Sequence, residues 1–138
     1  MRERPRDDEG GFGLVEVLVS MLVLGLLVAA FAPLVVQSMI VTAKNNTLAT
    51  AARLANERLE DARAVASTGD CTALATFLSS VDSSRKDGRS VPLTVGSTLA
   101  SCAPGSLSDV TVQVTTTSPQ FKNPTLAHVR TQIYVTTP

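Results

Sequence analysis

The sequence predicts an α+β protein: a long N-terminal helix followed by a small antiparallel sheet. Three observations support this fold class. From Val17 to Val36 only Ser20 is polar and no residue is charged. From Phe12 to about Ala66 no cluster of turn residues interrupts the chain, which favours one continuous helix. Beyond that helix, apolar and polar residues alternate in short segments, as they do in half-buried strands.

The apolar run is long enough to cross a membrane. Its twenty residues would span about 30 Å as a helix, the thickness of a bilayer hydrocarbon core. A cleaved secretory signal has a shorter apolar core of about 7–15 residues and a small-x-small cleavage site. Such a triplet within the run, Ala30-Phe31-Ala32, continues directly into Pro33 and is not a convincing cleavage site. The sequence therefore favours a membrane-spanning segment over an ordinary secretory signal.

The charges beside this segment predict its orientation. Arg2, Arg4 and Arg6 precede it, whereas Lys44 is the only nearby cation that follows it. Because the more positive flank stays in the cytoplasm, we expect the N-terminus inside and residues after about 40 outside. We accordingly expect a single-pass protein of the cytoplasmic membrane.

The second half of the long helix is amphipathic. Charged residues cover most of its surface, and Arg53 and Glu57 are spaced to form a weak ion pair. Apolar residues at three- and four-residue steps predict the face that packs on the sheet: Leu48, Ala52, Ala55, Leu59, Ala62 and Ala66. We expect Gly69 to end this helix and Asp70 to cap the next one.

The remaining residues predict a short helix and about three strands. Leu74, Phe77, Leu78 and Val81 have helical spacing. The segment 83–88 is polar and contains Gly88, so we expect a turn there. Three alternating sets predict the strands: Val91, Leu93 and Val95; Val110, Val112 and Val114; and Val129, Ile133 and Val135.

The two cysteines, Cys71 and Cys102, both follow the apolar run. Outside the cytoplasm disulfides persist, so we expect a bridge between them rather than two free thiols. A metal site is not expected, because His128 is the only histidine and no ligand cluster surrounds it. No cofactor is expected either.

The composition gives little support to an enzyme or a nucleic-acid-binding protein. His128 has no evident nucleophile or acid partner, so we expect an exposed strand histidine and no catalytic site. The net charge is zero, which offers no electrostatic argument for nucleic acid. Arg85, Lys86 and Arg89 form a small basic turn that we interpret as a solvated loop, with DNA contact as an unsupported alternative.

One short stretch carries a recognisable motif. Gly11 is followed by Phe12, then by three residues, then by Glu16 and the apolar run. This pattern resembles the class III leader of type IV prepilins and type II secretion pseudopilins. Acidic residues precede Gly10 where many members carry Lys or Arg, and Gly13 stands where Thr or Ser is more usual. The match extends over about residues 8–66 and looks most like minor pilins and I-type minor pseudopilins.

The resemblance implies a processing pathway and a set of partners. A prepilin peptidase would cut between Gly11 and Phe12 and methylate the new amine of Phe12. Gly25 and Pro33 fall where pilin helices carry a weak point that can unwind on assembly. The implied partners are that peptidase and methyltransferase, other pilin or pseudopilin subunits, an inner-membrane assembly platform and the lipid bilayer.

These expectations divide the chain into a cleaved leader (1–11), a transmembrane assembly helix (12–40) and an extracytoplasmic pilin-like domain (41–138). In apolar surroundings an unpaired carboxylate is penalised, so we expect Glu16 to pair with the Phe12 amine of an adjacent subunit. The implied function is a structural filament subunit of a type IV pilus or a type II secretion pseudopilus. A major or competence pilin, and a single-pass anchor carrying a binding module, are the alternatives.

Overall fold

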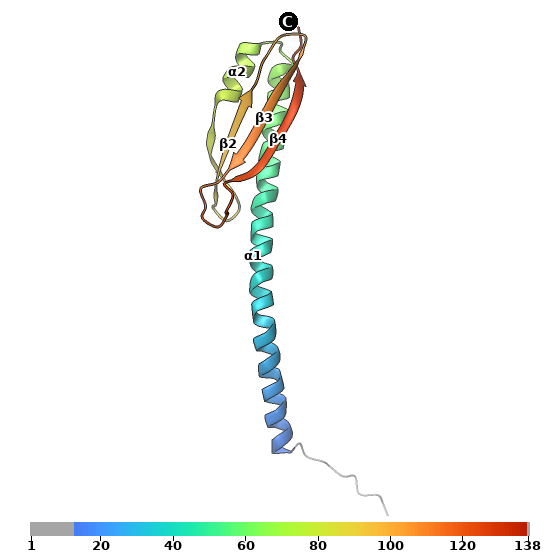
Figure 1. Cartoon of the computed structure of the whole chain (residues 1–138), viewed down its shortest axis with the longest axis vertical. Coiled ribbons are helices and arrows are strands. Elements are labelled where there is room, and N and C mark those ends of the chain that lie inside the picture. The colour runs from blue at the N-terminus through green and yellow to red at the C-terminus, as the bar shows by residue number, and fades with distance from the viewer. Residues whose placement is uncertain (1–12, 138) are drawn as a thin grey trace, which may run out of the picture. The chain divides into compact units, whose positions relative to one another are not determined.

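The computed structural model describes residues 13–137 of the chain. The elements follow one another as two helices and then four strands (Figure 1): α1 (Leu14–Ala66), α2 (Cys71–Ser79), β1 (Asp82–Lys86), β2 (Pro92–Leu99), β3 (Leu107–Thr115) and β4 (Thr125–Tyr134). The strands form one antiparallel sheet in the order β1-β2-β3-β4. The predicted α+β class, a long helix on a small antiparallel sheet, is confirmed.

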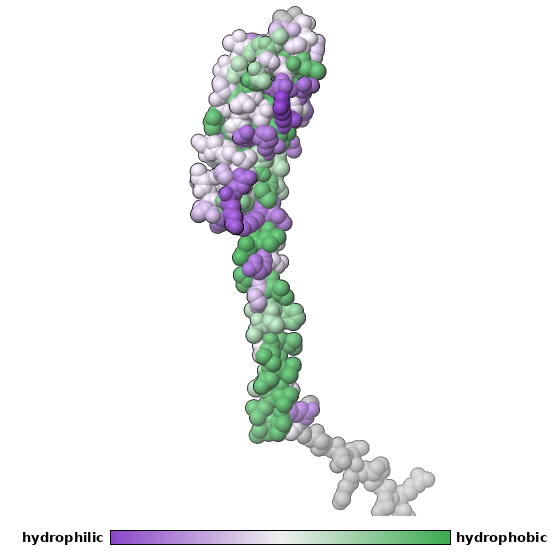
Figure 2. Space-filling model, in the orientation of Figure 1, coloured by the Kyte–Doolittle hydropathy of each residue, from purple (hydrophilic) through white to green (hydrophobic). Residues whose placement is uncertain are grey.

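The chain divides into two compact units between Val41 and Thr42, and helix α1 contributes residues to both. We call its residues Leu14–Val41 the apolar segment and Thr42–Pro138 the head. Side chains of the apolar segment are exposed throughout, and the segment is long and apolar enough to cross a membrane. Figure 2 shows an almost continuous hydrophobic surface on this part of the helix. The segment therefore has no protein core of its own to cover it.

Within the head, α1 packs on the sheet through small side chains. Four alanines of this face have no exposed surface. The buried residues of α1 are Thr47, Ala51, Leu54, Ala55, Leu59, Ala62 and Ala66. Two positions of the predicted stripe are wrong, because Leu48 and Ala52 are exposed. The buried face begins one residue earlier, at Thr47 and Ala51.

The sheet is a meander whose inner face forms the other half of the core. Val95 of β2 pairs with Val114 of β3, and Val112 of β3 pairs with Val129 of β4. All three predicted alternating sets lie in or beside strands, and their side chains contribute to the core. Because consecutive strands are antiparallel, the loops 87–91 and 116–124 lie at the same end of the sheet.

Strand β1 was not expected. The segment 83–88 was predicted to be a polar turn, but Asp82–Lys86 pairs with β2 as an edge strand. Its side chains are exposed or half-buried, so no alternation of apolar and polar residues marks it in the sequence. Charged residues on an exposed edge strand also discourage pairing with another chain.

Polar contacts close the end of the head at which α1 terminates. The backbone amide of Thr136 donates to Ala66 O at 3.3 Å, and its hydroxyl donates to Ser67 O at 2.7 Å. These bonds satisfy carbonyls that a helix end otherwise leaves free. Gly69 has φ of 76°, a conformation that favours glycine. The Asp70 carboxylate then caps α2, as expected, by accepting from the amides of Thr72 and Ala73.

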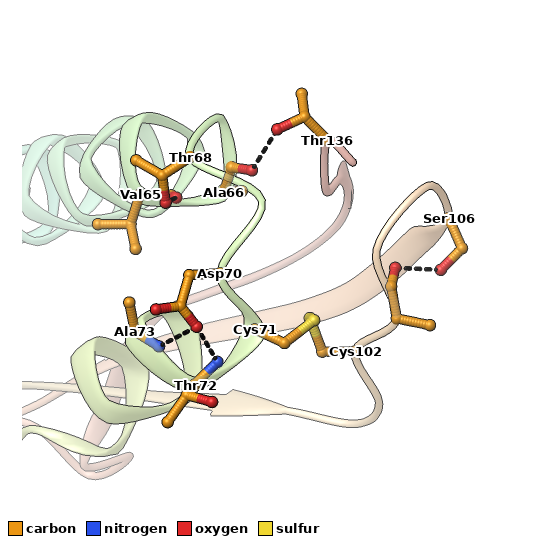
Figure 3. The surroundings of a disulfide bond; sticks show 11 residues. Val65, Ala66, Thr68, Asp70, Cys71, Thr72, Ala73, Cys102, Ser106 and Thr136 are labelled. Carbon is orange, nitrogen blue, oxygen red and sulfur yellow. Dashed lines mark hydrogen bonds between the residues drawn. A yellow bond between two sulfur atoms is a disulfide. The ribbon is translucent and has the colours of Figure 1, made fainter. Parts of the chain in front are cut away.

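The expected disulfide is present at this end (Figure 3). Cys71 at the start of α2 is bonded to Cys102 in the β2–β3 connection, with Cα atoms 5.8 Å apart and a sequence separation of 31 residues. Closing a loop of this length removes about 3–4 kcal/mol of chain entropy from the unfolded state in the loop-entropy model. The bridge fixes the small helix α2 to the sheet that follows it.

Replacing Cys71 with Ser should lower the free energy of unfolding of the head by about 3–4 kcal/mol. The measurement is denaturant unfolding of the full chain in detergent, followed by circular dichroism. Reductant should produce the same loss in the wild type and no further loss in Cys71→Ser. Ser101→Ala, an exposed neighbour of the bridge, is the matched control. Equal midpoints for wild type and Cys71→Ser would show that the bridge does not stabilise the head.

Candidate functional site

The predicted motif lies partly within the described residues. Gly11 and Phe12, the predicted cleavage and methylation positions, fall outside them. Glu16 is in the first turn of α1, where its amide donates to Gly13 O at 2.9 Å. The positive end of a helix dipole stabilises a carboxylate at this position. Glu16 is exposed, so a group from outside the chain can reach it.

Helix α1 is continuous through both positions of the predicted weak point. Pro33 lies inside the helix and cannot donate a backbone hydrogen bond. At Gly25 an added Cβ would meet no atom within 4 Å, so no packing contact within the described chain requires a glycine there. Both residues lower the stability of the helix relative to alanine. Unwinding between them on assembly stays a prediction.

Residues 6–32 match a family described as the prokaryotic N-terminal methylation motif. The chain therefore carries the class III leader of type IV pilins. The matched residues include Gly11, Phe12 and Glu16 and extend to Ala32 in the apolar segment. The match covers less than a quarter of the pilin-like chain and ends before the head. No curated protein and no solved structure in the comparisons matches the chain.

The head of this pilin-like chain also contains a polar contact between α1 and α2 that the sequence did not predict. Arg58 is one of the charged residues of α1 that lie outside the apolar stripe expected from the sequence. Its guanidinium donates to Phe77 O at 2.6 Å and to Ser80 O at 2.8 Å, and it lies 3.9 Å from the centre of the Phe77 ring. Arg58 thus binds two carbonyls at the C-terminal end of α2 and connects that helix to α1.

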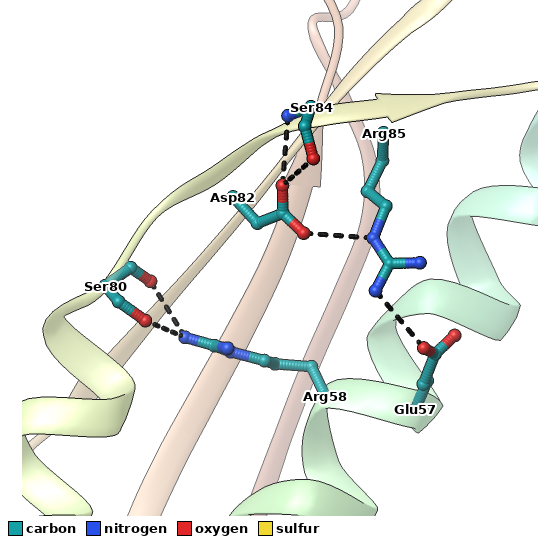
Figure 4. Close-up of polar contacts among 6 residues, drawn as sticks. All are labelled: Glu57, Arg58, Ser80, Asp82, Ser84 and Arg85. Carbon is teal, nitrogen blue, oxygen red and sulfur yellow. Dashed lines mark hydrogen bonds and ion pairs between the residues drawn. The ribbon is translucent and has the colours of Figure 1, made fainter.

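A second polar group connects the edge strand to α1 (Figure 4). Arg85 contacts Asp82 at 2.9 Å and Glu57 at 3.3 Å. Glu57 was expected to pair with Arg53, but its partner among the described residues is Arg85. Hydrogen bonds from the Ser84 hydroxyl and then from Arg85 lower the pKa of Asp82 to about 2. These contacts are largely exposed, so each contributes little to stability.

The third polar group, centred on Asp87, is buried. The side chain of Asp87 is only 3% exposed. Its carboxylate accepts from the Thr47 hydroxyl at 2.6 Å and from the amides of Arg89 and Val91, each at 2.8 Å. Arg89 also donates to Thr47 at 3.1 Å. Asp87 therefore attaches the β1–β2 loop to α1 at the point where the buried face of the helix begins.

Of the other residues considered from the sequence, His128 lies on β4 and is exposed. Its strand neighbour in the sheet is Gln113. Within residues 13–137 no group of three His, Cys, Asp or Glu side chains is placed to hold a metal ion. The Asp87 group was missed because Thr47 and Asp87 are forty residues apart, and neither residue forms a local motif with the other.

The Asp87 contacts predict a pH dependence. Burial raises the pKa of Asp87, but hydrogen bonds from Thr47, Val91 and Arg89 and the Arg89 charge outweigh it, so the pKa lies below its ordinary value. A carboxylate with a lowered folded-state pKa stabilises the fold above its unfolded pKa of about 3.9. That contribution is lost as the pH falls from about 4 through the folded-state pKa.

Asp87→Asn should lower the free energy of unfolding of the head at neutral pH by about 1–3 kcal/mol. It should also flatten the decrease in stability below about pH 4. Denaturant unfolding of the full chain in detergent at a series of pH values measures both effects. Asp70→Asn is the control, because Asn caps a helix about as well as Asp. A variant Asp87→Asn with wild-type stability and pH profile would contradict the role of the carboxylate.

Proposed function

We propose that this pilin-like chain is a structural subunit of a type IV pilus or a type II secretion pseudopilus. The observation that supports this most directly is the methylation motif at residues 6–32, which runs into an exposed apolar helix that is long enough to cross a membrane. A filament subunit needs both features. It must be held in the membrane before assembly, and it must release that helix into contact with other subunits afterwards.

The proposed domains follow from the methylation motif and from the apolar helix. Residues 1–11 form a cytoplasmic leader that a prepilin peptidase removes, and the Phe12 amine is then methylated. Residues 12–40 cross the cytoplasmic membrane and later pack in the filament, with Gly25 and Pro33 as its weak point. Residues 41–138 lie outside the cytoplasm and form the surface of the filament. The partners are the peptidase, neighbouring subunits and the membrane assembly platform.

The proposed assembly step uses charge pairing in an apolar environment. Cleavage exposes a positive amine on Phe12, and Glu16 offers an exposed carboxylate. A charge that leaves water without a partner is strongly penalised, whereas a close opposite charge offsets that penalty. Pairing Glu16 of one subunit with the Phe12 amine of the next therefore favours one axial step between subunits.

Glu16→Gln should lower incorporation into filaments by more than about tenfold, since removing one member of a buried ion pair costs about 3–5 kcal/mol. Membrane insertion and cleavage should be unchanged, because the apolar segment remains long enough to span the bilayer. Quantitative immunoblots of sheared filaments and of the membrane fraction measure both quantities in the producing cell.

Ser20→Ala is the matched control. It removes a polar group one turn further along the same helix, where the Ser20 hydroxyl donates only to Glu16 O at 2.7 Å. This variant should assemble like the wild type. Wild-type assembly of Glu16→Gln would contradict the charge-pairing step. A wild-type chain that stays full-length in the membrane and enters no filament would instead favour a plain membrane anchor.

A further inference from the structure

All three lysines of the chain lie at one end of the head. Lys44, Lys86 and Lys122 are far apart in the sequence and are all exposed. Lys86 ends β1 and precedes the loop 87–91, while Lys122 lies in the loop 116–124. The Thr116 hydroxyl donates to Pro92 O at 2.8 Å, so the two loops are neighbours. With Arg89, these lysines form what we call the basic collar.

The basic collar lies at the end of the head that contains the first residues of its part of α1. Asp87 and Arg89 both contact Thr47, which is only five residues after the start of the head at Thr42. Five helical residues correspond to about 7.5 Å along the axis. Lys44 is on this same part of the helix. The opposite end of the head is closed by the contacts between Thr136 and Ala66.

Acidic side chains are segregated from the collar. Among residues 13–137, Asp87 is the only carboxylate beside it, and that group is buried and hydrogen-bonded. On α1 the first acid of the head is Glu57, about 15 Å further along the helix. Asp82 and Asp109 lie near the starts of β1 and β3, towards the other end of the sheet. Asp87 offsets Arg89, so the three lysines leave the collar with a net positive charge.

We propose that the basic collar binds the phosphate groups of anionic phospholipids at the surface of the membrane that the apolar segment spans. This inference rests on the proposed function, because it requires the helix to be inserted. Lys44 follows Val41, the end of the apolar segment, by three positions, which places it at a membrane boundary. Each cation near an anionic bilayer surface raises partitioning about fivefold. The collar thus fixes the membrane-facing end of the head before assembly.

The acidic residues of a second copy are a weaker candidate for this partner. Glu57 already contacts Arg85 at 3.3 Å, and Glu60 pairs with Arg63 in its own helix. Collar lysines, by contrast, form no ion pair with any described residue of the chain. A lipid surface also matches the position of the collar, since it offers phosphate groups at the level where an inserted helix leaves the hydrocarbon.

The test reconstitutes the full chain in phosphatidylcholine vesicles that contain spin-labelled phosphatidylglycerol or spin-labelled phosphatidylcholine. Electron paramagnetic resonance then gives the preference of the protein for the anionic lipid. The double variant K86Q/K122Q should reduce this preference by up to about 25-fold relative to wild type at low salt, since each lost cation removes up to about fivefold. About 0.5 M salt should remove the difference between the two proteins. Arg89 is left unchanged, because it also supports the Asp87 contacts.

Arg130→Gln is the matched control, since it removes one exposed cation on β4 and should keep the wild-type preference. The leader arginines are the same in every variant, so their contribution cancels. An unchanged preference in K86Q/K122Q would overturn the inference. So would amine–carboxylate cross-links joining Lys86 or Lys122 to Glu57 or Asp61 of a second copy in place of lipid binding. Failure of the chain to insert, measured by carbonate extraction, would instead contradict the proposed function.

Discussion

The structure depends on one constraint: a single helix of 53 residues must satisfy two different environments. Up to Val41 its large apolar side chains are exposed, and such a surface is stable only in lipid or against other apolar helices. From Thr47 onward, one face is buried against the sheet through alanine and leucine. The change from one environment to the other takes place within about two turns. That short transition is also where Asp87 attaches a loop to the helix.

The fold class was predictable because its signals are repeated along the chain. An apolar run, a helical stripe and three alternating segments each reflect burial of one face. Strand β1 gave no such signal, since its residues are paired on one side only and remain largely exposed. The predicted stripe began at Leu48 rather than Thr47 because a threonine at a buried position looks polar in sequence. Its hydroxyl is satisfied by a carboxylate forty residues away.

The residues of the candidate site also fall into a group that the sequence could predict and a group that it could not. Gly11, Phe12 and Glu16 lie within six residues of one another, so their resemblance to the class III leader could be recognised in the sequence, and the family match covers them. The contacts of Arg58, Arg85 and Asp87 depend on elements that meet only in the folded head, and no local pattern predicts them. The basic collar belongs to this second kind, because three separate segments supply its cations.

These features describe a chain whose N-terminal end carries a methylation motif and an apolar helix, and whose head is closed by a disulfide and by polar contacts. The head needs both the disulfide and the helix contacts, since few aromatic residues are present to fill its core. The apolar segment needs neither. A division of this kind allows one end of the chain to change its surroundings from lipid to neighbouring helices while the other end keeps its fold.

The central claim is that the N-terminus is processed as in a pilin. Intact-mass and N-terminal peptide spectrometry of the chain, produced in cells with an active prepilin peptidase, tests it most directly. The account predicts a mature chain that lacks residues 1–11 and begins at a methylated Phe12. It also predicts that Gly11→Val remains a full-length precursor in the membrane. A wild-type chain that keeps its leader, or a Gly11→Val chain that still matures at Phe12, would contradict it.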